Sequence, residues 1–203
     1  MADLRAYVFL DRVQPQFAGY VGTVTSGDLL MAGMSALYLE VSPGNDVFRL
    51  VDVAVKAADV RLGAQLVERE FGLLELHSFD QSAVRLAGQT ILDHLGRAAR
   101  DAQRPELTST ERITNVHPYQ AQLLNRRRRG SLMLAGDSLV VVECQPAAYI
   151  NLAANEAEKA AAMTLVDVAS VGRYGRLWLA GREADVQAAQ SAALAALDRE
   201  PGR

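Results

Sequence analysis

The chain has 203 residues, of which 50% are hydrophobic and 22% are charged, and its formal net charge is −3. This composition excludes a mostly disordered chain and a nucleic-acid binder that depends on overall positive charge. The basic residues are unevenly divided, because Lys56 and Lys159 are the only lysines among the 21 Lys and Arg residues.

Cysteine usage and apolar runs indicate the setting in which the chain works. Cys144 is the single cysteine, so no disulfide can form within the chain. Residues 1–5 lack the features of a secretory signal, and no apolar run reaches the roughly 18 residues that span a bilayer. We therefore expect a reducing, cytoplasmic location and no membrane association.

The first half of the chain predicts the order strand, helix, strand, helix, hairpin, helix. Pro43 suits the first turn of a helix, and the apolar residues from Val47 to Ala58 have the spacing of one buried helical face. Lys56 falls opposite that face. The expected strands are residues 5–13, 35–41, 60–68 and 73–78, and the expected helices are 14–25, 43–58 and 80–95.

The second half repeats the first at an offset of 103 residues without a gap. Lys56 falls on Lys159, so both lysines occupy one repeat position. Other matches pair Gly27, Leu29, Ala32, Gly33, Ser35, Glu40 and Pro43 with Gly130, Leu132, Ala135, Gly136, Ser138, Glu143 and Pro146. The repeat predicts a first domain over 1–98 (unit one), a linker over 99–107 and a second domain over 108–203 (unit two).

Each unit is expected to be an α+β domain with an antiparallel sheet and flanking helices. The elements expected in unit two after its first strand and helix are strands at 138–144, 165–171 and 176–180, with helices at 146–161 and 183–198.

No catalytic or metal-binding constellation is visible in the sequence. His77, His94 and His117 lack metal-ligand spacing, and we expect surface or local structural roles for them. Cys144 falls inside a predicted strand, where a free cysteine commonly behaves as a small buried hydrophobe. The sequence therefore predicts a protein that is not an enzyme and has no cofactor or bound metal.

Two charged segments remain. Arg126 to Arg129 is read as a solvated helix end whose cations favour the helix dipole, with an anion or nucleic-acid site as the alternative. The predicted hairpin of unit one carries Glu68, Arg69, Glu70 and Phe71 at its tip. On its own this tip is a charged turn.

Several of these segments resemble one family, the circularly permuted tandem-domain shell proteins of bacterial microcompartments. The helix and edge-lysine segments resemble its shell-domain signature, and the strand and helix that precede them resemble its permuted order. Further segments are similar to its gated trimeric carboxysome members. The segments are 52–60 and 156–163 for the signature, and 7–11, 22–24, 42–44, 67–69, 145–149 and 152–160 for the trimeric group.

The resemblance implies a homotrimer whose six domains form a pseudohexamer, located in the shell of a carboxysome. In the carboxysomal group two trimers can stack face to face and enclose a chamber. Lys56 and Lys159 would lie at the tile edges, where the trimer meets hexameric shell proteins of the same microcompartment. The resemblance implies no nucleic-acid or membrane partner.

The resemblance also implies a central pore built from the hairpin tips. It assigns the pore and gate to Glu68, Arg69, Glu70, Phe71, Gly72, Val171, Gly172, Arg173 and Tyr174. Arginines converging on an axis repel by ~4 kcal/mol per pair at about 4 Å and an effective dielectric of about 20, unless carboxylates intervene. We therefore expect two loop arrangements of similar energy, one shut and one open, with ribulose bisphosphate entering and phosphoglycerate leaving.

Two other interpretations are open at this point. The chain is also compatible with a shell tile of a catabolic microcompartment. Some tandem-domain tiles of that kind hold an iron–sulfur cluster at the pore. Cys144 lies in a predicted strand and not at the hairpin tip, which disfavours that variant. The other alternative is a soluble trimeric small-molecule sensor, which would bind its ligand saturably and would not form sheets.

Overall fold

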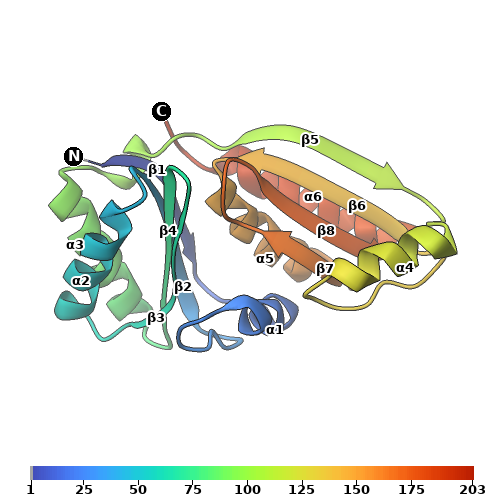
Figure 1. The fold of residues 1–203 in the computed structure, drawn as a ribbon, viewed down its shortest axis with the longest axis horizontal. Helices are drawn as coiled ribbons and strands as arrows, with labels where there is room; N and C mark the ends of the chain where they lie inside the picture. The colour runs from blue at the N-terminus through green and yellow to red at the C-terminus, as the bar shows by residue number, and fades with distance from the viewer. Residues whose placement is uncertain (1) are drawn as a thin grey trace.

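The computed structural model describes residues 2–203, which form two four-stranded antiparallel sheets placed side by side (Figure 1). Unit one has the strand order β1-β2-β4-β3, and unit two has the matching order β5-β6-β8-β7. This confirms the predicted fold class.

The strands and α-helices of the two units correspond one to one. Unit one contains β1 (Asp3–Leu10), α1 (Pro15–Val24), β2 (Ser35–Ser42), α2 (Asp46–Ala57), β3 (Arg61–Glu68), β4 (Phe71–Ser78) and α3 (Gln81–Leu95). A short helix, η1 (Ala99–Asp101), follows. The first strand of unit two, β5 (Glu106–Ile113), begins within the predicted linker. Unit two also contains α4 (Pro118–Arg127), β6 (Ser138–Gln145), η2 (Ala147–Tyr149), α5 (Ile150–Ala160), β7 (Thr164–Ala169), β8 (Gly175–Gly181) and α6 (Glu183–Arg199).

The prediction that Pro43 occupies the first turn of a helix was wrong. α2 begins at Asp46, and the Asp46 amide donates to the Pro43 carbonyl at 3.3 Å. The chain therefore makes a turn after β2 before the helix starts. Pro146 likewise precedes η2 rather than lying within a helix.

The core of unit one forms where α2 and α3 cover one face of its sheet. α2 buries Val47, Leu50, Val51 and Ala54, as its spacing predicts. The fully buried leucines of β2 and β4 lie opposite these residues in the same core. Each such side chain contributes about 1.5–3 kcal/mol relative to an exposed one.

The opposite face of that sheet packs against unit two. A second, larger core combines Ala6, Val8 and Tyr38 of unit one with Ile150 and Ala154 of α5. α5 therefore lies between the two sheets (Figure 1). Its residues Asn151, Leu152 and Asn155 are buried there, in addition to the side that faces its own sheet.

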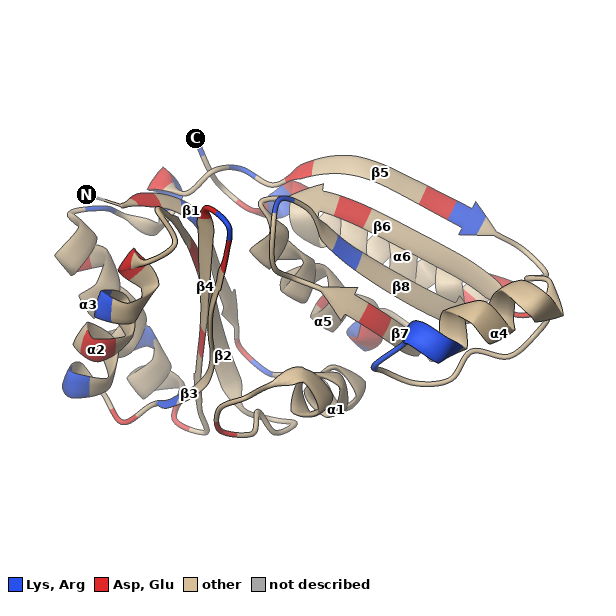
Figure 2. Ribbon diagram, in the orientation of Figure 1, with Lys and Arg blue, Asp and Glu red and all other residues tan. Residues whose placement is uncertain are grey.

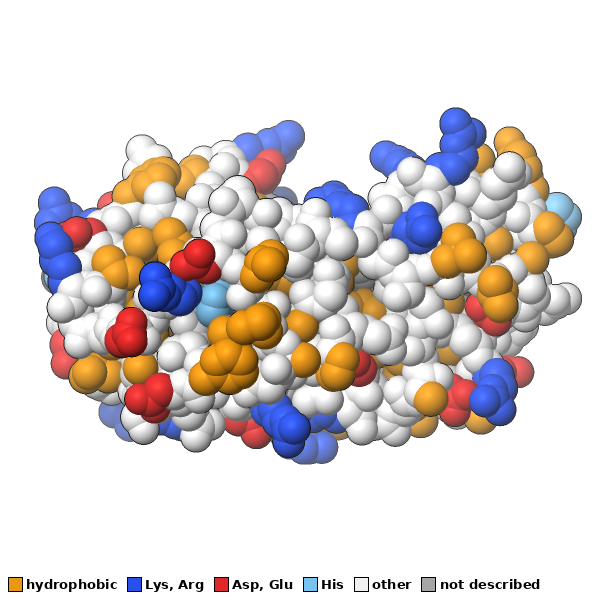
Figure 3. All heavy atoms as spheres, turned by 90° about the horizontal axis from the view of Figure 1, so that it is seen from below, with side chains coloured by type: hydrophobic (Ala, Val, Ile, Leu, Met, Phe, Trp, Pro, Cys, Tyr) orange, Lys and Arg blue, Asp and Glu red, His pale blue; other side chains and the backbone are white. Residues whose placement is uncertain are grey.

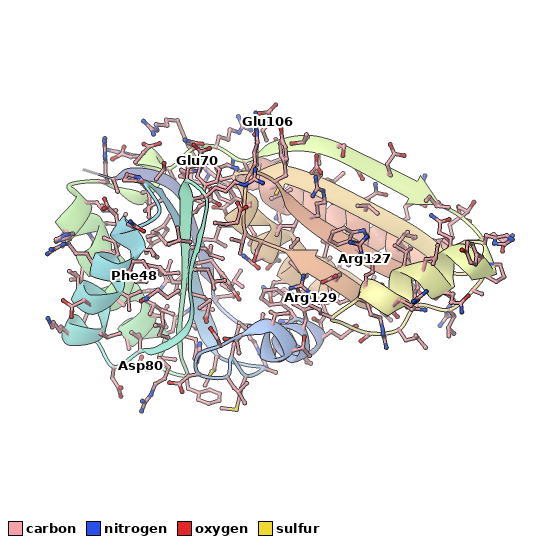
Figure 4. All side chains as sticks on the ribbon, viewed as in Figure 1. Phe48, Glu70, Asp80, Glu106, Arg127 and Arg129 are labelled. Atoms are coloured by element: carbon pink, nitrogen blue, oxygen red, sulfur yellow. The ribbon has the colours of Figure 1, made fainter. Side chains whose placement is uncertain are left out.

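Within residues 2–203, the equivalent surfaces on α2 and β5 have no such cover. α2, the counterpart of α5, lies on the side of unit one away from unit two, and its Phe48 and Val55 are 50% and 43% exposed (Figure 4). β5, the counterpart of β1, is exposed along most of its length. The chain thus contains one complete interface between units and both separate halves of a second one.

Exposed apolar side chains also occur at matching positions in the two units. Leu29 and Leu132 are one such pair, and Met31 and Leu134 are another. Seen from below, hydrophobic side chains are spread over both units (Figure 3). Within residues 2–203, no helix has the length and apolar character needed to cross a bilayer.

Candidate functional site

The two hairpin tips lie next to each other on one side of the molecule. Arg69 and Glu70 form the turn between β3 and β4, with Glu68 paired to Phe71. The charged tip of this hairpin lies beside the β7–β8 loop of unit two (Figure 2). The tips surround a cavity of about 710 Å³ lined by Glu68, Arg69, Glu70, Phe71, Val171, Gly172, Arg173, Tyr174 and Arg176.

The structure therefore brings eight of the nine sequence-predicted pore residues to one cavity and adds Arg176. Gly72 lies in β4 outside this lining, where its Cα packs closely against the backbone of Gly44. A side chain at Gly72 would clash with that backbone, so this glycine serves the base of the hairpin.

Arg69 and Gly172 occupy the same repeat position, and both adopt left-handed backbone conformations, with φ of 54° and 106°. A non-glycine residue in this region costs roughly 1–2 kcal/mol. The Arg69 side chain is 89% exposed, and its Nε lies 3.4 Å from Glu68 Oε1. Because an exposed ion pair contributes at most about 1 kcal/mol, Arg69 can exchange partners at little cost.

This backbone geometry predicts how substitutions at the two positions change the free energy of unfolding. Gly172→Ala places a Cβ in a left-handed conformation and 3.2 Å from the Glu68 carboxylate, so we expect a loss of about 1–2 kcal/mol. Arg69→Gly removes the strain at the matching position and should leave stability unchanged or slightly raised. Urea unfolding of both variants checks this, and equal stabilities for the two would contradict it.

Two residues that sequence reasoning missed support the unit-one tip. The Arg5 guanidinium lies over the Phe71 ring at 3.9 Å, and Arg5 Nε lies 2.6 Å from Glu40 Oε1. Glu40 Oε2 accepts a hydrogen bond from the Ala148 amide of η2 at 3.0 Å. These contacts connect the base of the tip to unit two. The one signal for them in the sequence is that Glu40 falls on Glu143 in the repeat.

Glu40 is a buried carboxylate whose ionisation depends on these contacts. Burial raises the pKa of Glu40, while Arg5 and the amides of Ala148 and Ala147 lower it. At the matching position Glu143 pairs with Arg176 in a more exposed setting. In unit two Arg173 lies beside Tyr174, with its guanidinium 5.3 Å from the ring centre.

The two lysines of the repeat have different surroundings. The Lys56 side chain is 72% exposed and lies 2.8 Å from Asp52. The Lys159 side chain is 30% exposed and contacts both Asp11 of unit one and Glu156 of its own helix. Lys159 thus takes part in the interface between the units, whereas Lys56 pairs with Asp52 of its own helix.

The remaining candidates have structural roles. His77 is buried beside Glu75, and His117 accepts a hydrogen bond from the Tyr119 amide at the start of α4. Burial raises the pKa of the Cys144 thiol to about 12. α4 ends at Arg127, as expected for an arginine run at a helix end. Across residues 2–203, no group of three His, Cys, Asp or Glu side chains is placed to hold a metal ion.

The tandem permuted α+β units and their adjoining hairpin tips define the class of microcompartment shell proteins. The model of the CsoS1D N-terminal domain matches residues 4–101. The chain is 48% identical to the carboxysome shell protein CcmP of Synechococcus elongatus over 201 residues, which is 99% of this chain and 94% of that protein. The chain belongs to the family of shell proteins that includes CcmP and CsoS1D.

Two solved structures have the same architecture over nearly the whole chain. The fused permuted hexameric shell protein MSM0275 from the RMM microcompartment has a TM-score of 0.95 and 45% identity, covering 97% of this chain and 96% of that one. The double ringed trimeric shell protein MSM0271 from the same microcompartment has a TM-score of 0.96 and 38% identity, covering 100% and 99%.

These relatives confirm the resemblance seen in the sequence. The chain is a structural protein of the microcompartment shell, in agreement with the prediction that it is not an enzyme. They favour the shell over the soluble sensor. The relatives of known structure belong to the RMM microcompartment, and the relatives found by sequence belong to carboxysomes. Both kinds of compartment therefore contain proteins similar to this chain.

Proposed function

We propose that the chain forms a homotrimeric, pseudohexagonal tile of a carboxysome shell, with 1–98 and 108–203 as its shell domains and a gated central pore. One observation carries the trimer: the chain holds a complete interface between its units and both open halves of a second. Joining α2 of one copy to the β5–β6 face of the next continues the same contact. Six units then close a ring from three chains.

The internal interface is a template for the proposed contact between chains. Asn155 Oδ1 accepts from the Gln14 amide at 2.9 Å, and the Glu158 carboxylate accepts from the first amides of α1 at 2.7 and 2.9 Å. The repeat places Asp52 at the position of Asn155 and Val55 at that of Glu158.

The partners of these residues change as well, because the repeat puts His117 at the position of Gln14 and Tyr119 at that of Gln16. Between chains, we expect the Asp52 carboxylate to accept from the His117 amide. Val55 would pack on Tyr119, and both of these side chains are exposed in the single chain. At these positions an apolar contact between chains would therefore replace the hydrogen bonds that Glu158 accepts within the chain.

Assembly is the most direct test of the tile. The purified protein should have the mass of three chains or of two stacked trimers, and it should enter sheets or shells when mixed with hexameric shell proteins of the same microcompartment. Lys56→Ala should reduce sheet formation and leave the trimer intact. A protein that stays monomeric, or that never joins a shell lattice, would contradict the proposal.

Stacking of two trimers is supported by the paired exposed side chains Leu29, Leu132, Met31 and Leu134. The unit-one copies remain exposed although the interface with unit two is formed, so these positions lie outside the ring contact. Each trimer thus repeats the same apolar positions six times, which suits a face-to-face contact. The double ringed trimeric relative MSM0271 supports the same arrangement.

In the trimer, three copies of each hairpin tip would surround the axis. The weakly held Arg69 and its neighbours Glu68 and Glu70 allow two charge pairings of similar energy, one for a shut pore and one for an open pore. An open pore lined by Arg69 and Arg173 favours phosphorylated anions. We propose ribulose bisphosphate entering and phosphoglycerate leaving as its traffic.

Conductance measurements test the pore. Replacing both Arg69 and Arg173 by Ala should lower the preference for phosphorylated anions over cations severalfold in bilayer-reconstituted trimers, because the favourable field is lost. Arg61→Ala, at the far end of β3 from the tip, is the matched control and should conduct like the parent. Equal selectivity in parent and double variant would count against an arginine-lined pore.

A further inference from the structure

A partly open cavity of about 220 Å³ lies between the sheet of unit one and the hairpin stem of unit two, and its lining includes the exposed residues Val24, Leu66 and Arg129. It is separate from the cavity at the hairpin tips. Its walls are apolar and include Leu66, Leu73 and Val171, and a polar cluster of Tyr20, Tyr38 and Glu75 lies at one part of its lining. It has room for several water molecules or one small organic ligand.

Tyr38 lines this cavity and has an unpaired hydroxyl group. Tyr38 is 3% exposed, and its hydroxyl has no hydrogen-bonding partner within residues 2–203. The neighbouring Tyr20 hydroxyl donates to the Val168 carbonyl. Buried hydroxyls are nearly always hydrogen-bonded, so the Tyr38 hydroxyl calls for a partner that the chain does not supply.

Glu75 faces Tyr38 directly, because the two residues are cross-strand partners on β2 and β4. Both carboxylate oxygens lie close to His77 Nδ1, at 3.1 and 3.2 Å. The carboxylate occupies the space left by Gly63, where any side chain would clash with it. Burial raises the pKa of Glu75, while His77 and the Gly63 backbone lower it. The carboxyl group is thus held in place beside the cavity.

The repeat shows that the fold does not require this polar cluster. Unit two has Val141 where unit one has Tyr38, Trp178 in place of Glu75, and Val166 in place of Gly63. The same strands therefore fold with apolar residues at these positions. Burying a polar group is unfavourable unless it is paired, so the unpaired Tyr38 hydroxyl, which has no counterpart in unit two, indicates a ligand.

We infer that this cavity binds a small neutral molecule with several hydroxyl groups, such as a short polyol. The Tyr38 hydroxyl donates to a ligand oxygen, and Glu75 accepts from a ligand hydroxyl. The apolar walls contact the CH groups of the ligand. A neutral ligand is favoured because Glu75 repels anions, and Arg129, the one cation in the lining, is solvent-exposed (Figure 4). The site lies within one chain, so it is independent of the proposed trimer.

Ligand-observed NMR on the full chain with erythritol as the probe tests the inference. We expect a saturable signal in the parent, at least tenfold weaker binding in Tyr38→Phe, and loss of binding in Ala64→Leu, which fills the cavity. Tyr7→Phe removes a hydroxyl from the opposite face of the same sheet and should bind like the parent. A crystal grown with erythritol should show it against Tyr38 and Glu75.

The thermal midpoint separates ligand binding from a structural role. Without probe, Tyr38→Phe should unfold at the same temperature as the parent or higher, because it removes an unpaired buried hydroxyl. Equal erythritol binding by parent and Tyr38→Phe, or water alone in the cavity at saturating probe, would overturn the inference. Stronger binding of glycerol 3-phosphate than of erythritol would overturn the assignment to a neutral ligand.

Discussion

Phe48→Asp should convert the trimer into monomers without unfolding them. Phe48 lies on α2, half exposed, at the repeat position of Asn151, which is 2% exposed against unit one. In the ring, Phe48 would therefore be buried against the next chain. An aspartate there loses the apolar burial and places a charge in the contact, which together cost about 3 kcal/mol or more per interface.

Phe79→Asp is the matched control for this change. Phe79 is also an exposed phenylalanine of unit one, but its counterpart Arg182 remains exposed although the interface between the units is formed. We expect this variant to stay trimeric. Sedimentation velocity gives the mass of each variant, and circular dichroism shows whether Phe48→Asp remains folded. A trimeric Phe48→Asp variant would rule out the proposed arrangement of the ring.

Arg5→Met should destabilise the folded chain by about 3–5 kcal/mol, because it leaves the buried Glu40 carboxylate without its charged partner. The change also removes the guanidinium that lies over Phe71. The double variant Arg5→Met with Glu40→Met removes the unpaired charge and should recover part of the loss, because it still leaves the Ala148 amide without its acceptor. Arg176→Met breaks the more exposed pair with Glu143 and should cost about 1 kcal/mol or less.

The loss in Arg5→Met should depend on pH. Burial raises the pKa of Glu40, and without Arg5 the folded-state pKa rises further above the unfolded value. The folded variant then binds a proton more tightly than the unfolded chain. Its deficit is largest above the folded-state pKa and shrinks as the pH falls through that pKa towards the unfolded-state value. A deficit in the thermal midpoint that is the same in alkaline and in mildly acidic buffer would contradict this account of Glu40.

The fold was largely predictable because the repeat gives two copies of the sequence pattern of each element. Strand and helix periods over Ser35–Val41 and Val47–Ala58 agree with their counterparts in unit two, and both hairpin tips fall between predicted strands. Pro43 was misassigned because a proline suits both a helix start and the turn before one. The local pattern does not distinguish these two cases.

The contacts between the units could not be predicted from the sequence. Arg5 and Glu40 lie on different strands, and Glu158 reaches the start of α1 from the other unit, so neither contact has a local pattern. The cavity beside Tyr38 exists only once the two units are packed together. The repeat matches positions in the sequence alone. Lys56 and Lys159 occupy matched positions, yet they have different neighbours in space.

That difference has a consequence for a shell lattice. If three chains close the proposed ring, the exposed Lys56 and the bridged Lys159 alternate around its rim, so neighbouring edges of the hexagonal outline are unlike. A truly sixfold tile can be set into a lattice position in six identical ways. This tile would have only three equivalent orientations, and a sheet built from it would have a preferred direction for each tile that its hexameric neighbours lack.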